Sequence, residues 1–470
     1  MMSPDVLVVG AGPAGMSAAL ALNAAGARVR VVDEQPGPGG QIYRAIDQVY
    51  DHRPQDLPLY GPDYARGREL TRRFLETEID FSCGTTVWDI SNKNGTPGVG
   101  LVQGDVASYV YPRHIILATG AMERPTPFPG WTLPGVMTVG AAQTLFKESA
   151  LMPDSQPVIV GSGPLIYLFV KQMIAAGCKP ALILDTGPDS VPVSRWSDLI
   201  QATFQNFGAL YKGWHWMREI KQAGVKRIAD VTALSARGDQ RLESIEYRLN
   251  NQSFQIKTDL LLVHDGVIPN SHLAFAADCE HRWNSVQRYW APVINPQGLS
   301  SQPDISIVGD SAGIAGADSA ACSGRVVGWN VANLLGLVGV DRCDSETMQD
   351  KQTIHRYSVL RRFLDNQYRP LEYFQTPTDM ETIVCRCENV RVSDLQEVAR
   401  LGCMGPNQGK AFTRCGMGPC MGRQCGNTVS QLFAQYHNRT VADIGHYRIR
   451  SPVRPLTLKQ LSTLDLSLGD

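Results

Sequence analysis

Six of the eleven cysteines lie between Cys385 and Cys425, and the other five are scattered over the preceding sequence. In a long chain, such local density is typical of metal ligation or redox chemistry rather than of a disulfide framework. Four thiolates can hold a [2Fe-2S] cluster, and glycines at positions 416, 418 and 422 would let the backbone approach its sulfurs. A structural zinc ion is the alternative, because all-cysteine coordination also suits zinc, although zinc would add no redox function.

A second group of residues, at the N-terminus, has the spacing of a dinucleotide-binding turn. In Gly10-Ala-Gly12-Pro-Ala-Gly15 the first glycine permits the tight turn, the second permits the approach of a pyrophosphate, and the third permits close packing of the following helix. The N-terminus of that helix also favours phosphate charge. About 20 residues later, Asp33 or Glu34 would accept hydrogen bonds from a ribose.

Three further segments favour a flavin over NAD at this first site. Gly39-Gly40-Gln41 follows the acidic pair, one buried strand ends at Thr119-Gly120, and another ends at Gly309-Asp310, where a carboxylate suits a ribityl or phosphate contact. The sequence therefore predicts an FAD site that comprises Gly10, Gly12, Pro13, Ala14, Gly15, Asp33, Glu34, Gly40, Gln41, Val87, Thr119, Gly120, Gly309 and Asp310.

A second glycine turn, Gly161-Ser-Gly163-Pro-Leu-Ile166, departs from the pattern at its third position. The β-branched Ile166 should push the helix away from the strand, although Asp185 after the next strand could still hold a ribose. We therefore expect a structural or weakened nucleotide site here. No acid–base constellation for a substrate stands out, so the catalytic residues stay unknown.

The elements around the two turns predict an α/β fold with two Rossmann-like domains. Each turn joins a strand, a helix and a second strand: 6–9, 16–25 and 29–32, then 158–160, 165–176 and 181–184. A length of 470 residues is too great for one core. The net charge of -1 indicates no general attraction to nucleic acid, and no run of eighteen apolar residues predicts a membrane span.

Over roughly the first 340 residues, the segments of the FAD site resemble the flavoprotein family that includes glutathione reductase. The resemblance implies an FAD domain in two pieces, 1–120 and 290–342, around an inserted NAD-like domain, 121–289. The redox disulfide of that family is absent, since no CxxxxC follows Gly40 and no CxxC lies near residues 130–145. After a connector, 343–382, we expect an α-helical [2Fe-2S] domain, 383–440, and an extended tail, 441–470, that docks along another part of the protein.

The cysteine segment resembles the bacterioferritin-associated ferredoxin family, which has a CxC, a gap of about thirty residues and a second cysteine pair. The gap from Cys387 to Cys420 fits that spacing better than the gap to Cys415. The resemblance implies Cys385, Cys387, Cys420 and Cys425 as the ligands. Cys415 stays an alternative, because the spacing from Cys420 to Cys425 is wider than the family's usual second pair.

Nearly end to end, the chain resembles the large (A or α) subunits of multi-subunit FAD-dependent amine dehydrogenases. These include opine oxidases, hydroxyproline and proline dehydrogenases, hydrogen cyanide synthase and sarcosine oxidase. The motifs that carry the resemblance begin at Asp33, Gly130 and Thr413: Asp-Glu-Gln-Pro-Gly-Pro-Gly-Gly-Gln-Ile-Tyr-Arg, Gly-Trp-Thr-Leu-Pro-Gly-Val and Thr-Arg-Cys-Gly-Met-Gly-Pro-Cys.

That resemblance implies a subunit that relays electrons from an amino acid or opine, such as octopine, nopaline or D-hydroxyproline. A partner FAD subunit of the glycine or D-amino-acid oxidase type would oxidise the C–N bond, and a quinone or dye would accept the electrons. The resemblance also leaves room for a second flavin (FMN) or nucleotide at a subunit interface and for a small ferredoxin-like third subunit. We expect a cytoplasmic protein, with peripheral binding at the inner membrane as a variant. Two alternatives stay open, a stand-alone NAD(P)H-dependent reductase and a non-catalytic scaffold.

Overall fold

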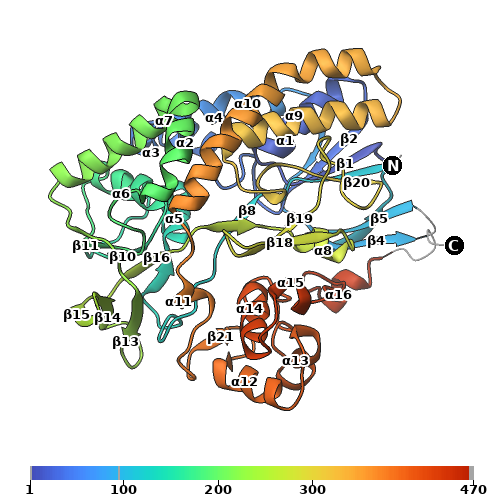
Figure 1. The fold of residues 1–470 in the computed structure, drawn as a ribbon. Coiled ribbons are helices and arrows are strands. Elements are labelled where there is room, and N and C mark those ends of the chain that lie inside the picture. Colours follow the sequence, from blue (N-terminus) through green and yellow to red (C-terminus); the bar gives the residue numbers. More distant parts are fainter. Residues whose placement is uncertain (1–2, 94–95, 465–470) are drawn as a thin grey trace.

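The first glycine turn belongs to a five-stranded parallel sheet whose strands, apart from the partly exposed edge strand at residues 80–82, are short, largely apolar and buried on both faces. In the computed structural model, which describes residues 3–93 and 96–464, the strand order is β20-β7-β1-β2-β3. Helices α1 (Pro13–Ala24) and α9 (Ala317–Leu334) pack on one face (Figure 1). The other face packs against the meander β4-β5-β6 (Thr85–Lys93, Thr96–Gln103, Val106–Val110). The sheet strands are β1 (Val6–Val9), β2 (Val29–Val32), β3 (Asp80–Ser82), β7 (His114–Leu117) and β20 (Ile305–Ile307).

The second glycine turn belongs to another parallel sheet, with the order β12-β11-β10-β16-β9. Helices α5 (Val139–Ser149), α6 (Pro164–Ala175) and α7 (Trp196–Gln222) lie on one side, and the meander β13-β14-β15 (Ala233–Arg237, Ser244–Leu249, Gln252–Lys257) lies on the other (Figure 1). The strands are β9 (Val136–Thr138), β10 (Val158–Gly161), β11 (Leu182–Asp185), β12 (Arg227–Ile228) and β16 (Leu261–His264). The prediction of two Rossmann-like domains is thereby confirmed.

Two antiparallel strands, β8 (Ala121–Glu123) and β17 (Val267–Pro269), connect the two sheets. After the hairpin β18-β19 (His281–Asn284, Tyr289–Pro292), the chain returns to the first sheet through β20. Helix α10 (Val340–Gln367) then packs along both α9 and α7, so most of the segment expected as a connector is one long helix. Smaller helices are α2 (Ile46–His52), α3 (Leu57–Tyr60), α4 (Pro62–Leu75), α8 (His272–Ala276) and α11 (Glu372–Gln375).

The cysteine-rich segment forms a small, mainly helical unit below the two sheets (Figure 1). Its elements are β21 (Ile383–Cys385), β22 (Val390–Arg391), α12 (Val392–Arg400), α13 (Pro406–Thr413), α14 (Gly426–Tyr436) and α15 (Val441–Ile444). The tail that follows returns to the first unit: the amide of Val453 donates to the carbonyl of Trp88 (2.8 Å), Arg454 pairs with Glu34 (2.6 Å), and α16 (Leu458–Leu461) packs by β6. The predicted tail, 441–470, is thus divided: its first part packs into the core of the cysteine unit, so that unit extends beyond the predicted bound at 440, and its later part, as far as residue 464, docks along the first sheet and its meander. The rest of the predicted tail, 465–470, lies outside the described residues.

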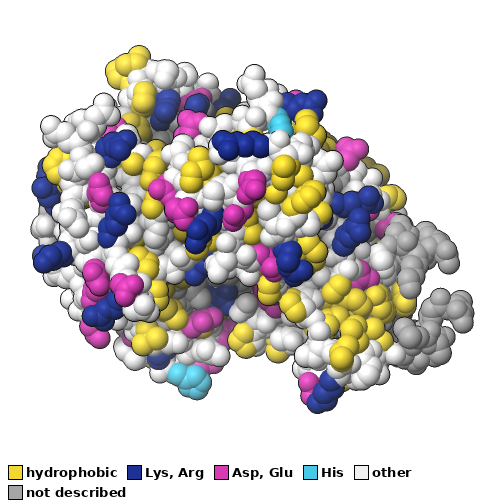
Figure 2. Space-filling view, turned by 90° about the horizontal axis from the view of Figure 1, so that it is seen from below, with side chains coloured by type: hydrophobic (Ala, Val, Ile, Leu, Met, Phe, Trp, Pro, Cys, Tyr) yellow, Lys and Arg dark blue, Asp and Glu magenta, His cyan; other side chains and the backbone are white. Residues whose placement is uncertain are grey.

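Charged side chains of both signs are interspersed over the face that is seen from below, without a large area of one sign (Figure 2). The mixture of charges on this face agrees with the net charge of -1. Among the helices in the described part of the chain, none is both long and apolar enough to cross a bilayer.

Candidate functional site

The three glycines of the first turn have different structural roles. A Cβ atom on Gly10, whose φ is +107°, would lie 2.4 Å from the carbonyl oxygen of Ala118, and one on Gly15 would lie 1.8 Å from that of Gly10. Gly10 and Gly15 are therefore required by the packing of strand, turn and helix. A Cβ on Gly12 would meet only the Cα of Gly40, at 3.8 Å, so this glycine is not required by the surrounding protein. Its missing side chain instead keeps the backbone open toward a cavity.

The two acidic residues after β2 also divide their roles. Asp33 is buried, and its carboxylate accepts hydrogen bonds from the amides of Ala11 (2.6 Å) and Gln35 (2.8 Å), so it braces the turn. Burial raises the pKa of Asp33 above its ordinary value. The half-exposed side chain of Glu34 lines the cavity and pairs with Arg454 of the C-terminal tail. Of the two acids, Glu34 has the freer carboxylate for a ribose.

Loops from distant parts of the chain complete this cavity of about 840 Å³. The hydroxyl of Thr119 donates to the carbonyl of Asn270 (2.6 Å), and Asp310 accepts from the amide of Ala315 (2.8 Å), so both loops are held in place. The predicted residues that line the cavity are Gly10, Gly12, Pro13, Ala14, Asp33, Glu34, Gly40, Gln41, Val87, Thr119, Gly120 and Asp310. Gly15 and Gly309 lie behind the wall; a Cβ on Gly309 would be 2.7 Å from the Cβ of Ala14, so this glycine lets its loop approach α1.

Sequence reasoning missed several polar residues of the cavity wall. Lys147 is fully buried and donates to the carbonyls of Gln41 and Ile42, and burial lowers its pKa to about 7. Arg423 and Arg454 line the wall from the C-terminal part of the chain. No local pattern could have assigned these residues, because they reach the cavity only when α5, the cysteine unit and the tail are packed against the first sheet.

At the second glycine turn, the first glycine is required by the backbone of the neighbouring strand, and the second lies against a side chain of the protein. A Cβ on Gly161 would lie 1.6 Å from the carbonyl oxygen of His264, and one on Gly163 would lie 3.5 Å from the imidazole of the same residue. That imidazole contacts Glu123 (2.7 Å), which also accepts from the amide of Gly140 (2.8 Å). A buried histidine and a carboxylate thus lie at the place where a pyrophosphate would approach the turn.

The remaining features of the second turn also differ from those of a nucleotide site. Ile166 occupies the position that Gly15 has in the first turn, and its side chain is buried in the core. A Cβ at Gly15 would clash with the first turn, so helix α6, which carries Ile166, has to lie farther from its turn than α1 does. Asp185, the acid that would hold a ribose, accepts hydrogen bonds from the Tyr167 hydroxyl, the Gly187 amide (2.7 Å) and Arg227 (2.8 Å). Its buried carboxylate is thus engaged by three donors of the protein itself.

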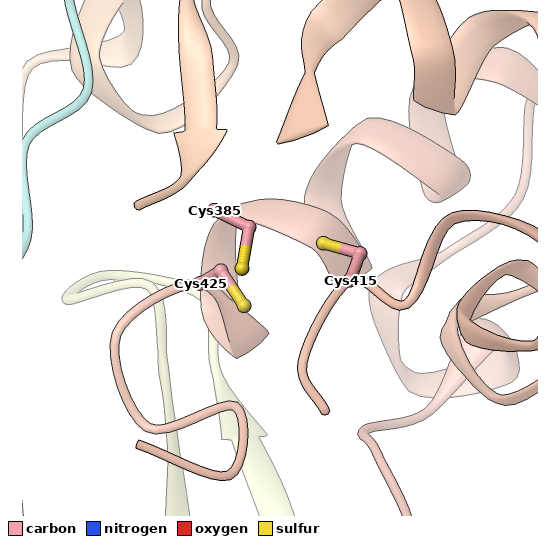
Figure 3. A group of neighbouring side chains, drawn as sticks. All are labelled: Cys385, Cys415 and Cys425. Atoms are coloured by element: carbon pink, nitrogen blue, oxygen red, sulfur yellow. The ribbon is translucent and has the colours of Figure 1, made fainter. Parts of the chain in front are cut away.

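Three cysteines of the C-terminal unit converge on one point (Figure 3). Cys385 ends β21, Cys415 follows α13, and Cys425 caps the N-terminus of α14; all three are buried, and their sulfurs lie within 4.8 Å of one another. Thiol hydrogen bonds from Cys415 and Cys425 lower the pKa of Cys385 to about 2, and the contact with Cys385 raises the pKa of Cys415 to about 12. A metal bound by these three residues would need them as thiolates.

The other two cysteines that were predicted as ligands form a separate pair beside this group. Cys387 is exposed and its thiol contacts that of Cys420, and Cys420 also lines the dinucleotide cavity. A Cβ on Gly418 would lie 2.3 Å from the Cβ of Cys387. This glycine therefore allows the loop before Cys420 to pass close to Cys387. Five thiols are therefore available as ligands. The structure brings together two of the four predicted ligands, Cys385 and Cys425, with Cys415, which was the alternative. The other two predicted ligands, Cys387 and Cys420, lie beside them as a pair.

The surroundings of the thiols fit a metal–sulfur centre. Tyr447 packs its ring over Gly416 and Gly422, at which a Cβ would lie 2.6 and 2.8 Å from ring carbons. The hydroxyl of Tyr447 is buried beside Cys415 and makes no well-directed hydrogen bond within the described residues. An unused donor beside buried thiols suits a cluster, because hydrogen bonds to cluster sulfurs are part of such sites.

Comparison with known proteins agrees with the fold of two Rossmann-like domains. The profile of the pyridine nucleotide-disulphide oxidoreductase family matches residues 4–332. The chain is 41% identical to the A subunit of an opine oxidase from Rhizobium meliloti, over 98% of this chain and 87% of the relative. It is 29% identical to the HcnB subunit of hydrogen cyanide synthase from Pseudomonas aeruginosa, over 97% and 98% of the two chains. The solved structure of L-proline dehydrogenase from P. horikoshii has a similar fold, with a TM-score of 0.70, 18% identity, and coverage of 98% and 79%.

Proposed function

This chain belongs to the family of opine oxidase A subunits, within the pyridine nucleotide-disulphide oxidoreductases, and on that basis we propose that it relays electrons from a partner subunit to an acceptor. It is a subunit of a heteromeric FAD-dependent oxidoreductase. The proposed partner oxidises the C–N bond of an amino acid or opine, because close relatives are opine oxidase subunits. FAD exchanges two electrons and an iron–sulfur cluster exchanges one, so the pair can divide electron pairs.

One observation carries the proposal of a relay. The same cavity is lined by the first glycine turn, through Gly12, and by the cysteine unit, through Cys420 and Arg423. The two proposed cofactor sites therefore share a wall, although their residues are about 400 positions apart in the sequence. Electron exchange between cofactors needs such proximity, and this fold provides it by packing the cysteine unit against the first sheet.

The chain's own residues divide the binding of FAD among several loops. The open backbone at Gly12 and Gly40 would receive the pyrophosphate, at the positive N-terminus of α1. Glu34 would accept from the adenosine ribose, and Asp310 would bind the ribityl chain or a phosphate. Arg423 and Arg454 add positive charge to the same wall.

The thiols favour a [2Fe-2S] cluster held by Cys385, Cys387, Cys420 and Cys425. Each iron of such a cluster needs two thiolates. The structure brings Cys387 beside Cys420 and Cys385 beside Cys425, which supports one pair for each iron. Cys415 would then remain a neighbouring thiol close to the sulfur of Cys385.

A stand-alone NAD(P)H-dependent reductase is not favoured by the second turn. The carboxylate of Asp185 is already engaged by three donors, and His264 with Glu123 lies against the glycines. We propose that this domain has a structural role. The proposal also includes a second flavin or nucleotide at a subunit interface, a small third subunit and a quinone or dye as acceptor.

The test is reduction of the cluster by substrate in the purified complex. The complex is prepared without oxygen, mixed with a panel of amino acids and opines, and followed by flavin absorbance and by electron paramagnetic resonance of the reduced cluster. We expect one substrate class to bleach the flavin and produce the cluster signal. The variant Cys420→Ser should lose the signal and keep bound flavin, whereas Cys83→Ser, at an exposed lone cysteine, should behave as wild type. Zinc in place of iron, or a cluster that no substrate reduces, would contradict the relay.

A further inference from the structure

Helix α7, which is kinked at Asn206, presents a stripe of large apolar side chains to solvent. The stripe consists of Trp196, Ile200, Phe204, Phe207, Tyr211 and Trp214, and each of these residues is between 50% and 87% exposed. They recur every three or four positions, which places Trp196, Ile200 and Phe204 on one side of the helix before its kink at Asn206, and Phe207, Tyr211 and Trp214 on one side after it. Neighbouring rings of the stripe stack or tilt together, with centroids 6.1 Å apart for Phe207 and Tyr211 and 5.9 Å for Tyr211 and Trp214.

The opposite side of α7 is firmly attached to the rest of the protein. Ala202 packs against Leu360 and Phe363 of α10, and the Asn206 side chain donates to the carbonyl of Arg356 (2.9 Å). The side-chain amide of Asn366 donates to Asp198 (2.9 Å). These contacts hold the helix against the protein, and the apolar stripe is its solvent-facing side.

The stripe is large enough to be one side of a stable protein interface. Its exposed fractions together equal between three and four whole side chains, or roughly 500–900 Å² for residues that are mostly aromatic. The largest apolar patch of a typical monomer is about 300–600 Å². A stable interface buries about 800 Å² on each partner, and its energetic centre is rich in aromatic residues.

The charges around the stripe favour a protein over a lipid surface. In the middle of the stripe, no charged residue stands between Asp198 and Lys212, and Lys212 is paired with Asp63. Positive charge occurs at its two ends, where Arg195 precedes Trp196 and the guanidinium of Arg218 lies 5.6 Å from the centre of the Trp214 ring. Helices that lie on a bilayer carry lysine and arginine along the polar face, where they meet anionic headgroups. An uncharged aromatic stripe instead matches an apolar groove or helix on another protein.

We infer that the α7 stripe is the docking surface for the substrate-oxidising partner subunit, which would present an uncharged apolar groove or helix to it. The inference rests on the proposed function. The position supports this occupant over a second copy of the chain, because Leu360 contacts α7 on one side and lines the dinucleotide cavity on the other. A partner bound at α7 would thus be one helix away from the proposed flavin site.

The test uses the full chain produced together with its partner subunit. The double variant Phe204→Asp/Phe207→Asp is compared with Leu334→Asp/Val340→Asp, which changes two similarly exposed apolar residues near the junction of α9 and α10. Size-exclusion chromatography with light scattering reports the assembly, and bound flavin and circular dichroism report folding. We expect the stripe variant to elute as an isolated, flavin-bearing chain and the control to remain in the complex. In the otherwise wild-type complex, a photo-crosslinking p-benzoylphenylalanine at position 204 should attach to the partner subunit.

Several outcomes would overturn the docking surface. One is an intact complex with the stripe variant, and another is a crosslink from position 204 to a second copy of this chain. A third is that the wild-type complex binds vesicles of phosphatidylethanolamine and phosphatidylglycerol, and that the stripe variant loses this binding while its complex stays intact. If the stripe variant does not fold, the crosslink still decides. If the wild-type chain copurifies with no second kind of subunit, the proposed function itself fails.

Discussion

Replacing Gly12 by valine should remove the flavin and leave the first domain folded, whereas replacing Gly15 by alanine should damage the fold itself. The backbone of Gly12, with φ -76° and ψ -177°, is accessible to any residue, and a Cβ there has only one neighbour, at 3.8 Å. A Cβ on Gly15 would lie 1.8 Å from a backbone oxygen. The same motif therefore contains one glycine that is reserved for the ligand and another that is reserved for packing.

The structure sets the expected magnitudes. Valine at position 12 stands at a helix N-cap, where an apolar residue costs about 1 kcal/mol, so the flavin-free variant should melt within a few degrees of flavin-free wild type. The side chain would occupy the approach of the pyrophosphate, and we expect at least a hundredfold loss of FAD affinity, about 2.7 kcal/mol. Alanine at position 15 requires a shift of more than 1 Å, and such overpacking costs about 1–3 kcal/mol with or without flavin.

Two measurements separate the roles of these glycines. Flavin that is released on denaturation gives the FAD content of each purified protein, and thermal unfolding followed by circular dichroism is compared between flavin-free samples only, because bound ligand raises stability by itself. Full FAD content in Gly12→Val would refute the assignment of the turn. A flavin-free Gly12→Val protein that is as destabilised as Gly15→Ala would refute the division of roles.

Three further predictions concern the thiols, the second turn and acid stability. Iron and sulfide analysis should find about two of each per chain, with loss of both in Cys420→Ser and a milder effect in Cys415→Ser; a Cys415→Ser protein without cluster, beside a normal Cys420→Ser protein, would overturn the ligand choice. Rapid mixing of the isolated chain with NADH should leave the flavin oxidised, because Asp185 is engaged within the protein, so fast bleaching would show that the second turn works. Burial lowers the pKa of His114 from 6.5 to about 4. Between these two values the unfolded chain binds more protons than the folded chain, so the free energy of unfolding decreases as the pH falls from 6.5 toward 4. Between pH 7 and pH 5 the loss of stability is about 2 kcal/mol. His114→Asn should reduce that loss in thermal unfolding at the two pH values, and an unchanged loss would mean that the buried contact of His114 with Ser306 is not responsible.

Elements with strong local signals were predicted nearly to the residue. The strands around both glycine turns are short apolar runs that end at a glycine or an acid, and β1 and β2 have the expected bounds. The sequence of helix α10 has no such local signal, because it is mostly polar. The helix packs against α9 on one side and α7 on another, and these tertiary contacts decide its conformation.

Features that depend on near neighbours along the chain could be read from the sequence: the two glycine turns, the strands that lead into them, the departure at Ile166 and the concentration of cysteines. Contacts across long separations became known only from the folded chain. Folding brings Cys415 to the thiols of Cys385 and Cys425, and it places Cys420 and Arg454 at the wall of the dinucleotide cavity. The difference arises because spacing along the chain limits how far apart two residues can be, whereas packing between units decides which of them come into contact.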